Sequence, residues 1–326
     1  MMLPRRRLLH LAAATAAVAA LARSARAQSY PTRPVRIIVS FPAGSGPDLR
    51  ARIVADQLGR IWGRQVVVEN RPGGGGTIGV QAVLSAAADG YTLLLAAASV
   101  FTVLPAQKDK PPFDVNRDLV PIALTSSEGM ALAVSSRLGV NTLAELITLA
   151  KHEPHKLIIG TNPAGSLPHL AAKLFVRLSQ APMTVVPSTG GTNEAVREIM
   201  GGRAHAVIES LPGLKGPLEA GDLKALAIMT PQRLPTAPGL PTAAETVPGL
   251  VAIGWTGLFA RSGTPEEIVQ QVSEDLRRMM ADAEVGARLE KAGMTPFHPQ
   301  FTGELARFVA REQELWWPIV REAATQ

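Results

Sequence analysis

Two glycine-rich turns, each set between an apolar segment and a helical pattern, constrain the fold of this chain most. The first runs from Phe41 to Asp48 and the second from Glu69 to Thr77. Glycines let the backbone approach a ligand closely, and the first amides of the following helix present unpaired N–H groups and the positive end of the helix dipole. The order of strand, turn and helix therefore predicts an α/β fold with an anion site at the ends of strands.

Strand and helix patterns alternate through the first part of the chain. Residues 35–40, 65–69 and 91–96 read as strands, and residues 49–62 and 78–88 as helices, with the apolar face of 49–62 at positions 49, 53, 54, 58 and 61. This alternation predicts parallel strands joined by right-handed helical crossovers.

A proline-containing stretch, residues 105–121, then interrupts the alternation, and two apolar segments, 122–124 and 130–134, follow it. The pattern restarts with a helix over 143–150, which opens on the capping box Thr142 to Glu145. Further strands are predicted at 157–159, 183–186, 206–208 and 225–229, and further helices at 170–178 and 194–200.

A second proline-rich stretch, 231–248, marks a return to the first part, and an apolar strand over 253–260 follows. Thr264 then gives an N-cap for a helix to about residue 282, and a last helix spans about 303–324 with Trp316 and Trp317 against the body. We therefore predict two lobes, each a mostly parallel sheet flanked by helices, with crossings near 125–130 and 250–256. The first lobe comprises residues 28–124 and 254–326, the second comprises residues 125–253, and the C-terminal helix can pack across both.

The N-terminus has the pattern of an export signal. Arg5 to Arg7 precede an apolar run from Leu8 to Leu21, and Ala25 to Ala27 supply a small-residue cleavage site. The run is shorter than the roughly 20 residues that span a bilayer. We expect residues 1–27 to be removed and the mature protein to be periplasmic, with the twin-arginine and general secretory routes both open.

The charge and composition exclude several classes of partner. The signal holds five of the 33 basic residues, which leaves 28 against 27 acidic residues in the mature chain. Without a basic face, and with 4% aromatic residues, nucleic acid is not an expected partner. The absence of cysteine excludes disulfides, thiolate metal sites and cysteine nucleophiles.

Motifs for cofactors and catalysis are weak or missing. Gly74, Gly76 and Gly79 match a dinucleotide fingerprint, but no acid lies near position 99. These glycines could alternatively serve only tight strand–helix packing. His152 and His155 are interpreted as a solvated helix end, so no metal and no cofactor are predicted, and the usual hydrolase, zinc protease and nucleotide triphosphatase motifs are absent.

Two residues of the first lobe, together with two turns and one histidine of the second, are the candidate polar groups. Asp48 lies at a helix start and is expected to organise its loop or to meet an ordered water, while Arg71 beside the second turn is expected to be solvated. In the second lobe, the turns Thr161 to Ser166 and Ser188 to Thr192 offer hydroxyls and amides, and His169 lies at a helix start with a capping or core role as possible as ligand contact.

The combined motifs resemble a known family over nearly the whole mature chain. They are Tyr30-Pro-x-x-Pro-Val-Arg-Ile-Ile-Val-x-Phe-Pro-x-Gly-x-Gly-x-Asp48, Val67-Val-Glu-Asn-Arg-Pro-Gly-x-Gly-Gly76 and Asp89-Gly-Tyr-Thr-Leu93. Later segments agree: Gly165-Ser-x-x-His-Leu170, Gly201-Gly-Arg203, Leu223-Lys-Ala-Leu-Ala227 and Trp255-x-Gly-Leu-Phe-Ala260. This pattern is similar to the extracytoplasmic solute-binding proteins of tripartite tricarboxylate transporters, the Bug family.

The resemblance implies a two-lobed Venus-flytrap receptor that closes on a small carboxylate and delivers it to a membrane permease. It implies that backbone amides, among them those of Ala43 to Gly46, and ordered waters hold one ligand carboxylate between facing loops. The predicted ligand-binding residues are Phe41, Ala43, Gly44, Ser45, Gly46, Asp48, Gly75, Ser99, Thr161, Asn162, Gly165, Ser166, His169, Ser188, Thr189, Gly190 and Glu209.

Two departures from the family pattern limit what the resemblance implies. Ser188 and Thr189 stand where the family commonly has Tyr-Lys, and His205 and Glu209 replace a frequent pair of aspartates. The identity of the carboxylate therefore stays open. Our leading hypothesis is a monomeric, non-enzymatic periplasmic receptor, and the alternatives are an exported ligand sensor and an exported enzyme using the same cleft.

Overall fold

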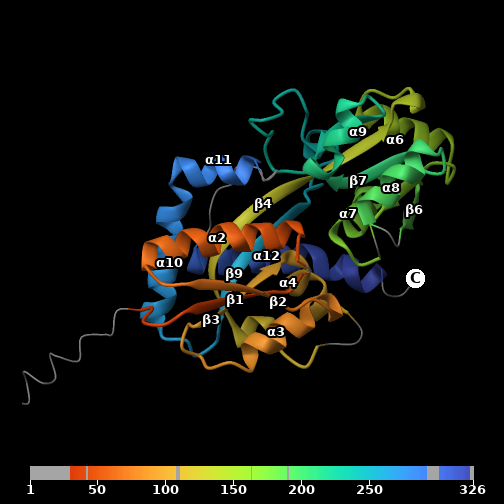
Figure 1. Ribbon diagram of the computed structural model, residues 1–326. Helices are drawn as coiled ribbons and strands as arrows, with labels where there is room; N and C mark the ends of the chain where they lie inside the picture. Colours follow the sequence, from red (N-terminus) through yellow and green to blue (C-terminus); the bar gives the residue numbers. More distant parts are fainter. Residues whose placement is uncertain are drawn as a thin grey trace, which may run out of the picture.

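The computed structural model describes residues 30–41, 43–107, 111–162, 164–188, 191–291 and 301–323 (Figure 1). The predicted signal, residues 1–27, lies outside these ranges, as do the predicted ligand-binding residues Thr189 and Gly190. Among the described residues, no helix is both long and apolar enough to cross a membrane.

Within these described ranges, nine strands form one continuous mixed sheet. Its order is β2 (Val66–Asn70), β1 (Val35–Val39), β3 (Thr92–Ala97), β9 (Ile253–Arg261), β4 (Leu119–Ser135), β7 (Ala206–Ser210), β5 (Ile158–Thr161) and β6 (Thr184–Pro187), with β8 (Leu223–Ile228) paired to β4.

The strand β4 joins two halves of this sheet. Residues 119–129 pair with β9, whereas residues 130–135 pair with β7 and β8, and Figure 1 shows β4 running between two groups of helices. The sequence predicted two separate apolar segments here, 122–124 and 130–134, after a proline-containing stretch that ends at Pro121. Instead the strand runs through Pro121, because the β4–β9 register shifts between Pro121 and Ala123, and such an irregularity accommodates the missing N–H of proline.

Within each half, the strands that helices connect run in the direction that the sequence predicted. β1 pairs in parallel with β2 and β3, and β5 pairs in parallel with β6 and β7, as the alternation predicts. The strands that cross between the halves, β4 and β9, pair antiparallel with their neighbours. The carboxyl ends of β1, β2 and β3 therefore lie together at one edge, and those of β5, β6 and β7 at another.

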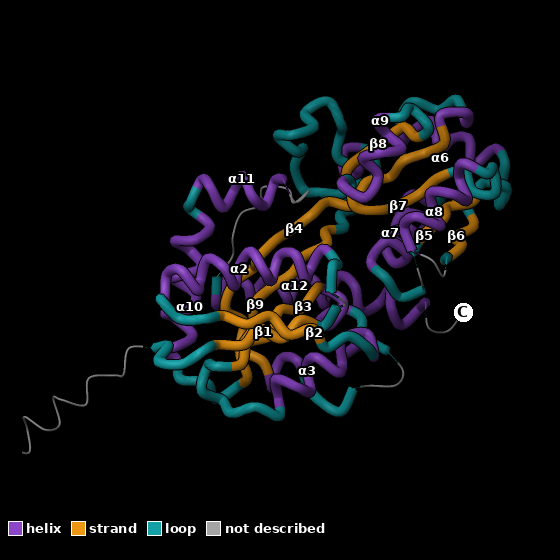
Figure 2. Tube along the Cα trace, in the orientation of Figure 1, coloured by secondary structure: helices purple, strands orange, loops and turns teal. Residues whose placement is uncertain are grey.

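Helices cover both faces of the sheet (Figure 2). The α-helices are α2 (Gly46–Trp62), α3 (Thr77–Leu84), α4 (Ala98–Thr102), α5 (Val115–Asp118), α6 (Leu143–His152), α7 (Leu167–Ser179), α8 (Gly191–Met200), α9 (Lys215–Glu219), α10 (Glu266–Met280), α11 (Ala283–Lys291) and α12 (Thr302–Ala323). Short 3₁₀ turns are η1 (Gly74–Gly76), η2 (Leu104–Ala106), η3 (Ser136–Leu138), η4 (Pro212–Leu214) and η5 (Ala243–Glu245).

The buried face of α2 matches the predicted one at Val54 and Leu58 and differs from it at both ends. Leu49 and Ile61 are 45% and 41% exposed, whereas Ala51, Val54 and Leu58 are buried. The small side chain of Ala51 lets the helix lie close to the sheet, so the large apolar residues at both ends of the pattern were a misleading guide to the face.

At two helix starts, the hydrogen bonds differ from the predicted ones. The Thr142 hydroxyl accepts the Glu145 N–H at 3.1 Å, but the Glu145 carboxylate accepts from Asn141 N rather than from Thr142 N. The N-cap prediction at Thr264 is wrong: its hydroxyl donates to the Arg261 carbonyl, and α10 begins at Glu266 after Pro265.

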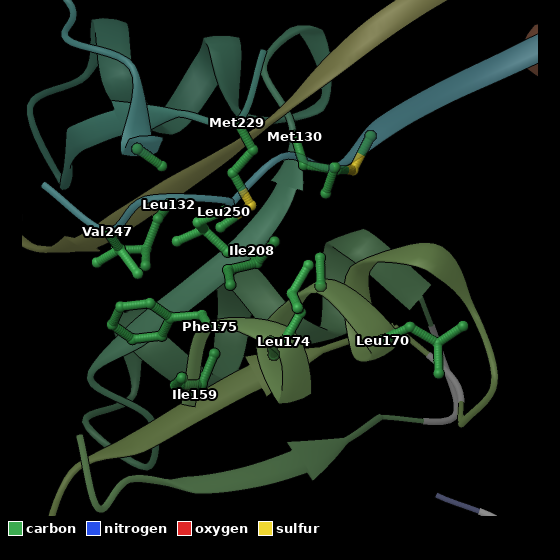
Figure 3. Packing of buried hydrophobic residues seen from close by; sticks show 14 of the residues in the cluster. Met130, Leu132, Ile159, Leu170, Leu174, Phe175, Ile208, Met229, Val247 and Leu250 are labelled. Carbon is green, nitrogen blue, oxygen red and sulfur yellow. The ribbon is translucent and has the colours of Figure 1, made fainter. Parts of the chain in front are cut away.

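Side chains alternate between two cores on opposite faces of each half. Along β3, Leu93 and Leu95 pack under α2 and α10, whereas Leu94 packs on the opposite face with α3 and α4. In the other half, Figure 3 shows Phe175 of α7 packed against Leu132 and Ile208 of the sheet. Each half is thus a helix–sheet–helix sandwich with its own cores.

The C-terminal helix α12 packs on both halves. Leu305 and Val309 belong to the core of the first half, and Trp316 and Ile319 belong to that of the second. Trp316 is 1% exposed, as predicted for a residue packed against the body, while Trp317 is partly buried.

A buried carboxylate lies between these two contacts. Glu312 Oε2 accepts the indole N–H groups of Trp255, on the crossing strand β9, and of Trp316, at 3.1 and 3.2 Å. Burial raises the pKa of Glu312, and the two indole hydrogen bonds partly offset that rise.

Candidate ligand-binding site

The first predicted loop is organised by the buried carboxylate of Asp48. Its Oδ2 accepts the Gly44 N–H at 2.8 Å and the Arg52 Nε–H at 3.0 Å, and its Oδ1 accepts from Asn70 Nδ2 at 2.9 Å. Asp48 is 1% exposed. The predicted role as loop organiser is confirmed by these bonds.

The same bonds keep Asp48 ionised. Burial alone would raise its pKa, but hydrogen bonds from Arg52, Gly44 and Asn70 outweigh burial, so the pKa of this carboxyl lies below its usual value. The Gly44 N–H is engaged inside the loop, which differs from our expectation that it meets the ligand. Gly44 adopts a φ of +80°, in the left-handed region that favours glycine, and a Cβ there would meet nothing within 4 Å.

The second glycine-rich turn is tied to the first loop through Asn70. This residue ends β2 and donates to the Phe41 carbonyl at 3.0 Å as well as to Asp48. Arg71 lies at the surface and pairs with Glu69, with Nε and Oε1 2.7 Å apart, as expected for a solvated arginine.

The glycines of the second turn also serve close packing. A Cβ at Gly76 would lie 2.6 Å from Val100 of α4, and a Cβ at Gly79 would lie 2.5 Å from the hydroxyl of Ser40 at the end of β1. The packing role weighed from the sequence therefore accounts for these two positions. Gly75 lies in η1 and Ser99 in the first turn of α4, at the carboxyl ends of β2 and β3.

In the second half, the turn after β5 leads into α7. The Gly165 N–H donates to His169 Nδ1 at 3.2 Å, and the Ser166 hydroxyl accepts the His169 N–H at 3.5 Å as the N-cap of the helix. His169 is 6% exposed. Burial, and to a lesser extent the charge of Lys173, lowers the pKa of His169.

The neighbouring strand ends converge on the same turn. The Ser188 N–H donates to the Thr161 carbonyl at 2.9 Å, and Asn162 Nδ2 donates to Glu209 Oε2 at 2.7 Å. Glu209 is 6% exposed and its Oε1 also accepts the Ser210 N–H. The structure therefore brings Thr161, Asn162, Ser188 and Glu209 together at the ends of β5, β6 and β7.

His205, the other departure from the family pattern, has a different position. Its Nδ1 accepts the Ile158 N–H at 3.1 Å, at the start of β5 and thus at the far end of that strand from the turn. The ring extends the β5–β7 pairing, which is a structural role.

An internal repeat escaped the sequence-based predictions. Residues 42–49 read Pro-Ala-Gly-Ser-Gly-Pro-Asp-Leu, and residues 163–170 read Pro-Ala-Gly-Ser-Leu-Pro-His-Leu, with six of eight positions identical. Aligning the two predicted strand–turn–helix units of the sequence is enough to find this repeat. The described parts of both turns adopt the same conformation, with φ of +80° at Gly44 and +79° at Gly165.

Arg50, which the sequence-based predictions did not include, connects the start of α2 to the crossing strand β4. Arg50, two residues after Asp48, is 6% exposed and its Nη2 lies 3.0 Å from Glu128 Oε2. Glu128 pairs with Gly254 at the point where β4 passes from one half of the sheet to the other. No local sequence signal identifies this pair, because its residues are far apart in the chain.

The two halves also contact each other near the turn after β5. Val103, which follows α4, belongs to the core of the second half, and its Cγ1 would lie 4.0 Å from a Cβ at Gly165. The segment after β3 therefore reaches the turn after β5. Among the described residues, no group of three or more histidine or acidic side chains could hold a metal ion.

Two sheet halves joined by crossing strands, with loop–helix units at their strand ends, define a periplasmic binding protein fold of the solute-binding class. The model of the tripartite tricarboxylate transporter family receptor matches residues 50–324. The chain therefore belongs to this family. The BugT protein of Bordetella pertussis is 34% identical over 303 residues, which cover 92% of each chain.

Solved structures agree with this assignment. A protein of R. palustris with adipate is 30% identical, covers 90% of this chain and 98% of that chain, and has a TM-score of 0.76. A TctC solute-binding protein from Polaromonas, with no ligand, is 26% identical, covers 90% and 100%, and has a TM-score of 0.79. MatC from Rhodopseudomonas palustris with bound malate is 28% identical, covers 89% and 100%, and has a TM-score of 0.72.

Proposed function

We propose that this protein is a periplasmic, monomeric receptor that captures a small organic carboxylate between its two lobes and delivers it to the permease of a tripartite tricarboxylate transporter. The observation that carries the proposal is the pair of alike loop–helix units after β1 and β5, each with a glycine in the left-handed conformation beside a helix N-terminus. Such turns present N–H groups and the positive end of a helix dipole to an anion.

The chemistry of the loops supports binding rather than catalysis. Asp48 and Glu209, the acids of the two loops, both accept hydrogen bonds that position neighbouring groups: Gly44, Asn70 and Arg52 for the first, Asn162 and Ser210 for the second. A general base needs a proton acceptor aimed at substrate. We infer that both acids shape the loops of a receptor.

Related proteins support a carboxylate as the ligand class. The structures with adipate and with malate are of chains that this protein matches over about nine-tenths of its length. Both ligands are small dicarboxylates, so a ligand with at least one carboxylate is the natural candidate here.

A thermal-shift screen tests the ligand class. The purified mature protein is heated with mono- and dicarboxylates, including malate and adipate, and a ligand at 100 times its dissociation constant should add about 2.7 kcal/mol of stability. Native mass spectrometry should then find the ligand bound and chemically unchanged. A converted ligand would indicate an enzyme, and a panel without any shift would contradict the proposal.

Two matched glycine variants test the loop. Gly44 and Gly139 have φ of +80° and +76°, and a Cβ meets nothing within 4 Å at either site. Gly44→Leu and Gly139→Leu should each lose about 1–2 kcal/mol of stability through backbone strain. Only Gly44→Leu should abolish the ligand-induced shift, and Arg71→Ala should keep it. A larger loss of affinity in Arg71→Ala than in Gly44→Leu would indicate that a side-chain salt bridge, and not the backbone amides, holds the ligand.

The transport partner needs a separate measurement. Membrane vesicles that contain the permease should accumulate a labelled carboxylate only when the loaded receptor is added. Uptake that is independent of the receptor would favour the ligand-sensor alternative.

A further inference from the structure

The repeated loop motif has one chemical difference at the residue that closes each turn. In both copies the residue four positions after the left-handed glycine accepts that glycine's N–H: Asp48 Oδ2 from Gly44 at 2.8 Å, and His169 Nδ1 from Gly165 at 3.2 Å. The flanking N-cap serines match as well, with φ and ψ of −72° and 162° at Ser45 and −71° and 160° at Ser166.

The correspondence continues one helical turn further. Arg52 and Lys173 are both four residues after the closing residue. In the first copy Arg52 donates to the Asp48 carboxylate. In the second copy a cation at that place disfavours a charged imidazole, since like charges on one helix face repel. The second unit thus has the same backbone as the first, with a neutral acceptor in place of an anionic one.

We propose that His169 is a positioning residue that holds the second-lobe turn in its ligand-binding conformation through an unprotonated Nδ1, as Asp48 holds the first. The inference rests on the proposed function of the two loops. A backbone N–H can only donate, so the nitrogen that faces Gly165 must lack a proton and the other ring nitrogen must bear it. When Nδ1 gains a proton, two donors face each other and the Gly165 N–H loses its acceptor.

The charged surroundings of His169 favour the neutral ring. α7 packs against β5, β6, β7 and α12. β5 and β6 contain no ionisable side chain, and the one acid of β7, Glu209, accepts from Asn162 and Ser210. On the half of α12 beside α7, Glu312 accepts from two tryptophans and Glu322 lies 3.8 Å from Arg177, while Glu314 and Arg321 are exposed. Burial and Lys173 lower the pKa of His169.

The expected consequence is a pH dependence that belongs to the second lobe alone. Because the folded pKa of His169 is depressed, the turn is held at pH values above the ordinary histidine pKa of about 6.5 and is lost as pH falls through the folded pKa. Below that pKa, the dissociation constant of the ligand should rise about tenfold per pH unit. The Asp48 turn should hold throughout this range, because its acceptor stays ionised.

Calorimetric titration with malate and with adipate, from pH 7.5 down to pH 4.5, tests this with four proteins: wild type, His169→Asn, His169→Leu and His152→Asn. Asn offers an uncharged oxygen acceptor and does not titrate, so it should bind as wild type does at pH 7.5 and lose the excess pH dependence. Leu should weaken binding by about tenfold or more at pH 7.5, because it leaves the Gly165 N–H without an acceptor. His152 is an exposed histidine at the end of α6, and its variant should follow wild type.

Any protonation of the ligand or of Asp48 affects wild type and His169→Asn equally. The ratio of their two dissociation constants therefore isolates the effect of protonating His169. A ratio that stays constant with pH would overturn the proposal. Nitrogen NMR of the imidazoles adds a measurement that needs no ligand: Nδ1 of His169 should lack a proton at pH 7.5. A protonated Nδ1 at pH 7.5 would overturn the proposed positioning role of His169, whereas failure of every carboxylate to bind would overturn the proposed function.

Discussion

At the scale of single residues, Asp48 shows how a buried charge shapes a loop through hydrogen bonds as well as through packing. One carboxylate takes hydrogen bonds from a backbone amide, a guanidinium and a side-chain amide. These donors come from the loop, from α2 and from the end of β2. A single side chain therefore connects both glycine-rich turns of the first half of the sheet.

Asp48→Asn should lower the free energy of unfolding by about 2 kcal/mol at pH 7, because an amide cannot accept from all three donors. The depressed pKa makes the wild-type advantage present above the ordinary aspartate pKa, about 3.9, and it is lost as pH falls through the folded pKa. Urea unfolding at pH 7 and pH 3 measures both effects.

Asp56→Asn on the same helix is the control. Asp56 is 40% exposed and pairs with Arg60 and Arg288 at the surface, so its loss should change stability by less than about 1 kcal/mol. Equal losses at Asp48 and Asp56 would show that the buried hydrogen bonds contribute little.

At the scale of elements, α12 is the helix that lies across both halves of the sheet. Its residues enter the core of each half, and the buried Glu312 between them connects the helix to the crossing strand β9. Relative motion of the halves therefore has to be accommodated by this helix as well as by β4 and β9.

Glu312 gives a prediction for this element. Glu312→Leu should lower the free energy of unfolding by about 3 kcal/mol, because it leaves two buried indole N–H groups without acceptors. Glu312→Gln keeps a carbonyl oxygen for both indoles and removes a buried charge, so its stability at pH 7 should equal or exceed that of wild type.

The pH dependence of Glu312 has the opposite sign to that of Asp48. A raised folded pKa means that wild type gains stability as pH falls, with the gain complete below the ordinary glutamate pKa, about 4.3. Denaturant unfolding followed by tryptophan fluorescence measures these values, with the exposed Glu314→Gln and Glu314→Leu as controls. A Gln variant as unstable as the Leu variant would show that the charge itself is required.

At the scale of the whole molecule, the two halves are joined by the strands β4 and β9, by α12 and by the segment that contains Val103. The Arg50–Glu128 ion pair links the start of α2, after the first glycine-rich turn, to the point where β4 changes partners. A ligand that contacts loops of both halves would therefore favour one relative arrangement over others.

Ligand should shift the molecule from an open to a closed population, since binding energy is gained only where both loops touch the same carboxylate. Small-angle scattering with saturating malate or adipate should show the radius of gyration fall towards about 19 Å, the value for a compact chain of roughly 300 residues. Gly44→Leu with the same additive should show no change. An unchanged curve for wild type with bound ligand would contradict closure.

Local patterns determined much of this protein. Hydrophobic periodicity and glycine-rich turns predicted the strands, most helices and the loop–helix units, because these depend on residues close together in the chain. The order and spacing of the motifs were enough to indicate the family. The contact of Asp48 with the Gly44 amide also lies within one turn, whereas its contact with Asn70 spans 22 residues and required the fold.

The tertiary structure decided what depends on distant partners. The continuity of β4 through Pro121 required its pairing with β9, and the Arg50–Glu128 pair spans 78 residues. The sequence contains the repeated turn, but only the fold revealed that His169 takes the place of Asp48 as the acceptor for a glycine amide. Whether a side chain accepts a hydrogen bond, meets solvent or packs in a core depends on burial and on the neighbours that folding brings to it, and neither is written in the residues beside it.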